Sequence, residues 1–188
     1  IAEYNDAEQL SEIVEKEKPA CVIMEPVLGN VGVVPPEKGY LKEVRKITEE
    51  NDTVLIFDEV ITGFRLSPGG AQEYYGVIPD MTVCAKVMGG GLPGSAFMGR
   101  REIMEKVAPS GKVYAAGTYA GNPVSAVAGT AQIEYMSEKN RYADLNRKSE
   151  RLAKAFSDIL EDSGTAGTVN SVGSMLSVFF GLDGVKNA

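Results

Sequence analysis

The sequence contains no histidine among its 188 residues. Without an imidazole, the chain cannot supply a Ser-His-Asp triad, a Cys-His pair or a histidine-ligated metal site from its own residues, and we expect no metal. Cysteine is also scarce, because only Cys21 and Cys84 are present, each in an apolar run. Two isolated cysteines predict reduced, buried thiols in a cytoplasmic protein, with a disulfide between them as the minor alternative.

An excess of positive charge is missing as well. The 19 Lys and Arg residues are outnumbered by 26 Asp and Glu, which gives a formal net charge of −7. Such a chain lacks the basic surface that binds nucleic acid or an anionic membrane. No apolar run approaches the roughly 20 residues of a membrane span, and no signal peptide is evident, because Ile1 opens a polar, acidic segment. We therefore expect neither a nucleic-acid nor a membrane partner.

Helical and strand patterns alternate along the first part of the chain. Residues 7–17 and 37–50 carry apolar side chains at helical spacing. Residues 20–24, 53–57 and 81–85 are short apolar runs, typical of strands buried on both faces. A helix between two such strands indicates a parallel sheet. The predicted fold class is therefore α/β, with a mostly parallel sheet flanked by helices.

The rest of the chain predicts further elements and a second unit. We expect a strand at 96–98, a short helix at 101–107, a helix that Asn122 caps and Pro123 begins, a long helix at 141–161 and a strand at 175–180, with loops at 62–79 and 164–167. The small residues of the helix after Pro123 predict close packing against the sheet. A boundary near 138 would divide the chain into a large domain, 1–138, and the beginning of a smaller α+β domain, 139–188.

Two charged residues follow apolar runs directly. Asp58 comes after the run that begins at Val54, and Lys86 follows the next run, just before Gly89-Gly90-Gly91. In open α/β sheets, ligands bind at the carboxyl ends of the strands. A lysine there can form a Schiff base with a carbonyl, and an aspartate there can pair with a pyridinium nitrogen. Together they are the two groups that pyridoxal phosphate needs to act as an electron sink.

Other interpretations of these residues stay open at this point. A single lysine after a strand is usually a solvated surface residue. An Asp-Glu pair after a strand is more often part of a turn or a cap. The three glycines lack the Lys-Ser/Thr that would make a phosphate-binding P-loop.

Several motifs in a fixed order carry more information than spacing alone. They are Glu25-Pro26-Val27-Leu28-Gly29-Asn30, Gly32-Val33-Val34-Pro35-Pro36, Phe57-Asp58-Glu59-Val60-Ile61-Thr62-Gly63-Phe64-Arg65, Gly69-Gly70-Ala71-Gln72, Lys86-Val87-Met88-Gly89-Gly90-Gly91-Leu92-Pro93, Gly99-Arg100-Arg101-Glu102-Ile103-Met104 and Gly117-Thr118-Tyr119-Ala120-Gly121-Asn122-Pro123. In this order the chain resembles the class III pyridoxal-phosphate aminotransferases, from Tyr4 to its end. The resemblance implies the large domain of a type I pyridoxal-phosphate-dependent transferase.

The resemblance also implies a role for each candidate site residue. Lys86 would hold pyridoxal 5'-phosphate as an imine and shuttle protons between substrate carbons. Asp58 would bind the ring nitrogen, Val60 would pack on the ring, and Asn30 would lie near the ring hydroxyl. Thr118 would reach the phosphate of the cofactor in the neighbouring subunit, because the family places its active site at a homodimer interface. Glu25, Glu59 and Arg65 are expected to give structural support only.

Two positions favour the aminomutase branch of the family. Asn30 stands where many ω-amine transaminases have an acid, and Ile61 stands where many have Gln. That branch exchanges the amino and oxo groups of (S)-4-amino-5-oxopentanoate to give 5-aminolevulinate for tetrapyrrole synthesis. Small departures near the cofactor, at Ala85, at residues 94–97 and at Tyr119-Ala120, leave the substrate less constrained than the cofactor. The alternatives are another class III ω-amino acid or diamine aminotransferase, and a non-catalytic remnant of the fold.

The resemblance also predicts that the chain is the middle part of a longer enzyme. The family's phosphate-binding loop, ring-stacking aromatic residue and mobile lid would precede Ile1, and the rest of the small domain would follow. We expect this stretch alone to be inactive.

Overall fold

A computed structural model describes residues 1–187. The elements follow one another in the order α1 (Ala7–Glu17), β1 (Cys21–Met24), α2 (Tyr40–Glu50), β2 (Val54–Glu59), α3 (Gly70–Tyr75), β3 (Met81–Cys84), the 3-10 helix η1 (Lys86–Gly89), β4 (Ala96–Gly99), α4 (Arg101–Met104), α5 (Pro123–Ser137), α6 (Arg141–Asp162), β5 (Gly167–Val172) and β6 (Met175–Phe180). Among these helices, none combines the length and the apolar character needed to cross a membrane.

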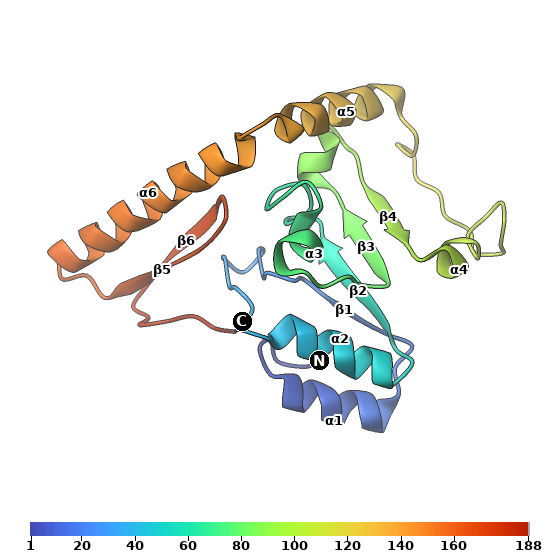
Figure 1. Cartoon of the computed structure of the whole chain (residues 1–188), viewed down its shortest axis with the longest axis horizontal. Helices are drawn as coiled ribbons and strands as arrows, with labels where there is room; N and C mark the ends of the chain where they lie inside the picture. Colours follow the sequence, from blue (N-terminus) through green and yellow to red (C-terminus); the bar gives the residue numbers. More distant parts are fainter. Residues whose placement is uncertain (188) are drawn as a thin grey trace.

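The central sheet has the strand order β1-β2-β3-β4 (Figure 1). β2 runs parallel to both β1 and β3, whereas β4 is antiparallel to β3. The carboxyl ends of the first three strands therefore meet at one edge. The prediction of a mostly parallel sheet flanked by helices is confirmed.

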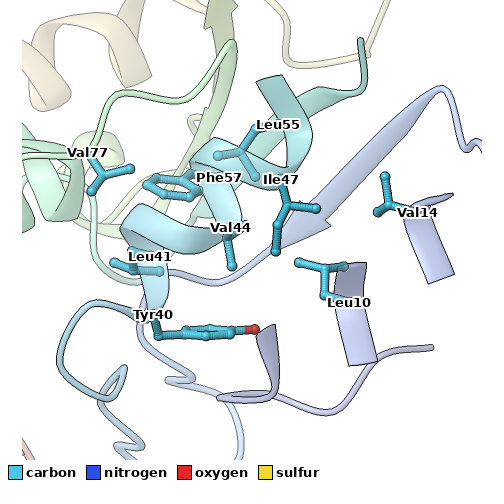
Figure 2. Packing of buried hydrophobic residues seen from close by; sticks show 9 residues of the cluster. All are labelled: Leu10, Val14, Tyr40, Leu41, Val44, Ile47, Leu55, Phe57 and Val77. Atoms are coloured by element: carbon cyan, nitrogen blue, oxygen red, sulfur yellow. The ribbon is translucent and has the colours of Figure 1, made fainter. Parts of the chain in front are cut away.

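One face of the sheet carries the main hydrophobic core, under α1 and α2 (Figure 2). Leu10 and Val14 of α1 lie on the same side of that helix and are buried, as the helical spacing predicts. They pack together with α2 and with Leu55 and Phe57 of β2, which have no exposed surface. Burying each of these two β2 side chains contributes about 2–3 kcal/mol to folding. The core thus fixes the orientation of β2.

The opposite face of the sheet is only partly covered, and here the prediction of strands buried on both faces is wrong. Val54, Ile56 and Asp58 alternate with the buried residues of β2 and keep partial exposure. On β1, which was also expected to be buried, Ile23 is 61% exposed. The reason is that the α1–α2 core forms on one face alone, so that apolar residues pointing the other way meet no helix of that core.

A two-stranded antiparallel sheet, β5–β6, packs beside α6 at the other end of the molecule (Figure 1). The expected loop at 164–167 is shorter than predicted, because β5 begins at Gly167. The hairpin is not isolated from the rest of the chain, since Val172 and Met175 join a buried cluster with Val27, Val33, Leu66 and Ala71. The division into domains at 138 stays a prediction.

The helix α5 begins where the sequence predicts, but its main packing partner is η1, and not a strand of the sheet. Asn122 caps it by accepting hydrogen bonds from the amides of Val124 and Ser125. The contact with η1 is very close, because a side chain at Gly129 would collide with the carbonyl oxygen of Met88. Small residues therefore let α5 approach the backbone directly after Lys86.

Candidate functional site

The carboxyl edge of β2 and β3 brings two of the predicted site residues to neighbouring strands. Asp58 lies one residue before the end of β2 and pairs in register with Val83 of β3. Lys86 lies two residues beyond Cys84, which ends β3 and pairs with Glu59. Because the two strands are parallel, both residues stand at the edge where ligands bind in open α/β sheets.

The carboxylate of Asp58 is held by one hydrogen bond only. Its Oδ1 accepts a hydrogen bond from the amide of Val60 at 3.0 Å, which orients the side chain. Its Oδ2 has no hydrogen-bond partner within residues 1–187, and the side chain is partly exposed on the open face of the sheet. An oriented carboxylate with one free oxygen is available to a donor on a ligand.

Lys86 combines an unusual backbone conformation with a free amine. Its φ is +47°, in the left-handed region, which costs a residue other than glycine about 1–2 kcal/mol. The residue opens η1 and is exposed, and within residues 1–187 its amine forms neither a hydrogen bond nor a salt bridge. Strained residues of this kind cluster at functional sites. The arrangement therefore leaves the amine available to react with a ligand.

Asn30 and Val60 belong to the same edge. Asn30 lies in the loop after β1, and Val60 is the first residue after β2. The two segments are in contact, because a Cβ on Gly29 would lie 2.8 Å from Cδ1 of Ile61. Asn30 is exposed and Val60 is partly exposed, so both can face a ligand.

Thr118 lies apart from the other four candidates. It is exposed, in the segment that connects α4 and α5. Figure 1 shows this segment beside β4, the edge strand farthest from β1, and its residues Gly117 and Tyr119 line a pocket together with Val83 of β3 and Phe97 of β4. The structure thus groups Asn30, Asp58, Val60 and Lys86 at the carboxyl edge and leaves Thr118 on a surface segment.

An open pocket of about 1050 Å³ lies next to this edge, between β3, β4, α5 and the segment 114–122 that precedes α5. Val83, the register partner of Asp58, forms part of its wall together with Phe97 and Ser125. None of the five candidate site residues lines it. The candidate site is therefore an open edge next to a pocket, not the pocket itself.

Glu59 has a larger part in this edge than the sequence indicated. Its side chain has no exposed surface, and its carboxylate accepts hydrogen bonds from the hydroxyl of Thr62 (2.9 Å), the amide of Ala71 (2.5 Å), and both the amide and the side chain of Gln72 (each 3.1 Å). The expectation of structural support is met, but the sequence missed the helix α3 that Glu59 binds. The Gly69-Gly70 pair at its start was the available signal, because a side chain at Gly70 would collide with Glu59.

The two acids at this edge also affect the neighbouring thiol. Burial, and after it the negative charges of the Glu59 and Asp58 carboxylates, together raise the pKa of Cys84 to about 11. The thiol is therefore neutral at physiological pH. Cys84 is buried and free, as predicted, whereas Cys21 is free but exposed, so the prediction of a buried thiol is wrong there. Cys21 points toward the uncovered face of the sheet, which explains its exposure.

Comparison with known proteins identifies the family. The sequence model of the class-III aminotransferases matches residues 2–187. The chain belongs to the class III aminotransferases. Among curated relatives, the glutamate-1-semialdehyde 2,1-aminomutase of Archaeoglobus fulgidus is 56% identical over 178 residues, which are 95% of this chain and 43% of that protein. The chain thus spans less than half the length of the curated relatives it matches.

Solved structures of class III aminotransferases share the fold. An ω-transaminase from Sphaerobacter thermophilus superposes with a TM-score of 0.87 at 31% identity, covering 94% of this chain and 41% of that one. A glutamate-1-semialdehyde aminomutase from Pseudomonas aeruginosa superposes with a TM-score of 0.86 at 26% identity, covering 99% and 43%. A variant of the latter, in complex with PMP, gives a TM-score of 0.83 at 25% identity, again covering 99% and 43%.

Proposed function

We propose that the protein carrying this chain binds pyridoxal 5'-phosphate at the carboxyl edge of β1, β2 and β3. The observation that carries the proposal is that two adjacent parallel strands end close to an oriented carboxylate, Asp58, with one oxygen free, and to an amine, Lys86, that has no partner within residues 1–187. The donor set fits the cofactor, because an aldehyde needs an amine and a ring nitrogen needs an acid. When bound, the cofactor would supply an electron sink for charge that develops on substrate carbons.

Each residue then has a defined task. Lys86 would hold the cofactor covalently and afterwards carry protons between substrate carbons. Asp58 would keep a proton on the ring nitrogen, since a nearby negative charge favours the protonated form. Val60 would cover one face of the ring and exclude water, and Asn30 would donate to the ring hydroxyl.

We propose an aminomutase reaction for the whole protein. The enzyme would exchange the amino and oxo groups of (S)-4-amino-5-oxopentanoate, which is glutamate-1-semialdehyde, to give 5-aminolevulinate for tetrapyrrole synthesis. The level of identity to a protein named for this reaction supports the choice, since 56% identity extends across 95% of the chain. Asn30 and Ile61, at positions where many transaminases differ, point the same way.

A second candidate is an ω-amino acid or diamine aminotransferase. The superposition on an ω-transaminase, with a TM-score of 0.87, supports this candidate, although the fold is shared by both kinds of enzyme. A transaminase needs a separate oxo-acid acceptor, whereas the mutase returns the amino group to the same molecule. A non-catalytic remnant of the fold is the third alternative, and the presence of both Asp58 and Lys86 argues against it.

We further propose a cytoplasmic homodimer in which Thr118 reaches the cofactor phosphate of the partner subunit. The exposed position of Thr118, in the segment between α4 and α5, supports this arrangement, because an exposed residue is accessible to a second subunit. The two free cysteines suit a reducing compartment.

One incubation separates the candidate functions. The purified protein, loaded with pyridoxal phosphate, is given glutamate-1-semialdehyde with no amino acceptor or donor, and 5-aminolevulinate is measured. We expect product to accumulate over many turnovers. Product formation that requires an added oxo acid would favour the transaminase, and a failure to bind pyridoxal phosphate would favour the remnant.

A further inference from the structure

The buried carboxylate of Glu59 connects the two strands that carry Asp58 and Lys86. It ends β2 directly after Asp58 and accepts four hydrogen bonds, three of them from Ala71 and Gln72 at the start of α3. The side-chain amide of Gln72 then donates a second hydrogen bond, at 3.2 Å, to the hydroxyl of Thr82 in β3. Thr82 is itself only 4% exposed. The chain of contacts therefore runs from β2 through α3 to β3, on the face of the sheet opposite to Asp58.

The backbone after Glu59 forms a tight turn that packs closely against β3. The amide of Gly63 donates to the carbonyl oxygen of Glu59 at 2.9 Å, which closes the turn after β2. A side chain at Gly63 would come within 2.7 Å of that oxygen and 2.9 Å of Sγ of Cys84. The turn that Glu59 begins also contains Val60, whose amide orients the carboxylate of Asp58. The position of Asp58 thus depends on the turn that Glu59 holds.

On β3, the same network ends at Thr82, in the strand that leads to Lys86. Cys84 pairs in register with Glu59, and Lys86 follows it after a single residue. Lys86 adopts a left-handed conformation that persists only if its surroundings hold it. The amides of Met88 and Gly90 form hydrogen bonds to Ala85 and Val87, so this segment is ordered around the lysine.

We infer that Glu59 is a positioning residue for the cofactor site: its carboxylate ties the end of β2 to α3 and, through Gln72, to β3, and thereby holds the segments that carry Asp58 and Lys86 in place relative to each other. The inference rests on the proposed function for the identity of the ligand. The positioning itself is a property of this chain, and it can be measured without the cofactor.

The first test is Glu59→Gln in the whole protein, with Glu73→Gln as the matched control. A glutamine at 59 has nearly the same shape, but either orientation of its amide points an NH₂ group at a backbone N–H, of Ala71 or of Gln72. Glu73 is an exposed carboxylate on the same helix that accepts one hydrogen bond from Gly69. In the absence of cofactor, we expect hydrogen exchange at Met88 and Gly90 to become at least tenfold faster in Glu59→Gln and to stay unchanged in Glu73→Gln.

The second readout is the affinity for pyridoxal phosphate and the pH midpoint of its visible absorbance when bound. We expect Glu59→Gln to weaken binding at least tenfold and to shift that midpoint, whereas Glu73→Gln changes neither. Unchanged exchange at Met88 and Gly90 would overturn the inference. A rise in exchange spread equally over α1 and α2 would also overturn it, because Glu59 would then be a general stability residue.

If Glu59→Gln does not fold, Thr82→Val decides the question, because it removes only the hydroxyl that connects Gln72 to β3. We expect about threefold faster exchange at Met88 and Gly90 and about threefold weaker cofactor binding. A folded Thr82→Val protein that matches the wild type in both would overturn the inference. If the wild type binds no pyridoxal phosphate, the proposed function fails, and the exchange data alone still decide the role of Glu59.

Discussion

At the amino edge of the sheet, Asp80 uses both of its oxygens, whereas at the carboxyl edge Asp58 keeps one oxygen free. Asp80 directly precedes β3 and accepts hydrogen bonds from the amide of Leu55 (2.8 Å), from Arg45 (2.8 Å) and from Arg100 (3.1 Å). At the other edge, Lys86 has no hydrogen-bond or salt-bridge partner within residues 1–187, and Asp58 has only the amide of Val60. One edge satisfies its charges internally, and the other leaves them for a ligand.

The difference shows how one sheet separates stability from function. Asp80 joins β2, β3, α2 and the end of β4, and it is itself only 6% exposed; its partner Arg45 is largely buried, whereas its partner Arg100 is exposed. Burial would raise its pKa, but the hydrogen bond from Leu55 and the two guanidinium groups outweigh burial and lower the pKa below its ordinary range. Lys86, by contrast, has no charged or hydrogen-bonding partner for its amine within residues 1–187. Substitutions at the two edges should therefore damage different properties.

The largest effect is expected for Lys86→Ala. The variant should lose covalent attachment of pyridoxal phosphate and at least about 1000-fold in turnover, because it removes both the amine and the proton carrier. Its unfolding free energy should stay within about 0.5 kcal/mol of the wild type, since the exposed amine forms no hydrogen bond or salt bridge within residues 1–187. Lys42→Ala, at an exposed position on α2, is the control and should change neither property. Retained covalent binding in Lys86→Ala would contradict the assignment.

A smaller loss is expected for Asp58→Asn. The neutral amide cannot hold a proton on the ring nitrogen as a carboxylate does, so turnover should fall about 100-fold while the cofactor still attaches to Lys86. Steady-state kinetics and the absorbance spectrum measure the two effects separately. Asp52→Asn, in the exposed turn at the amino end of the same strand, should behave as the wild type. Equal turnover in Asp58→Asn and the wild type would remove Asp58 from the site.

Asp80→Asn should lower the stability of the protein and leave its turnover almost unchanged, which is the opposite of the effect of Lys86→Ala. It leaves the largely buried Arg45, whose side chain is 18% exposed, without its counter-charge, and should lower the unfolding free energy by about 2 kcal/mol. Turnover at a temperature where the protein is folded should stay within twofold of the wild type. Denaturant titration measures the first quantity. Glu102→Gln, which removes only an exposed partner of Arg100, should leave the unfolding free energy almost unchanged, because water screens exposed ion pairs. Equal stabilities of the two variants would contradict the contrast between the edges.

The smallest expected effect is that the difference in unfolding free energy between the wild type and Asp80→Asn depends on pH. Because the pKa of Asp80 is lowered in the folded protein from its ordinary value of 3.8, the unfolded chain takes up the proton first as the pH falls. The contribution of Asp80 is therefore complete above about pH 4 and is lost as the pH falls through the folded pKa. The difference in unfolding free energy between wild type and Asp80→Asn should shrink over that interval. A difference that grows on acidification would contradict the direction of the shift.

Local patterns predicted the parts of the fold that depend on local sequence. Apolar spacing gave α1 with its buried Leu10 and Val14, and the two parallel strands that carry Asp58 and Lys86. The order of the sequence motifs predicted the class III aminotransferase family, which the family comparison confirms. Burial on both faces of β2 was wrong, because a run of four apolar residues does not reveal whether anything covers each side.

Other features depend on contacts between distant residues and could not be predicted locally. The helix α3 begins with Gly70, which has a φ of +71°, and its first turn is held by Glu59 from another element. The strand β5 opens at a glycine and forms only because β6 pairs with it. The ion pairs of Asp80 join residues up to 35 positions apart. In each case the stabilising partner is absent from the local pattern.

The most direct test of the central claim is to find which amine holds the cofactor. The protein is loaded with pyridoxal phosphate and reduced with borohydride, which fixes the cofactor to that amine, and the modified peptide is then located by mass spectrometry. The account predicts a single adduct, on Lys86. An adduct on any other lysine, or no adduct in protein that binds the cofactor, would contradict it.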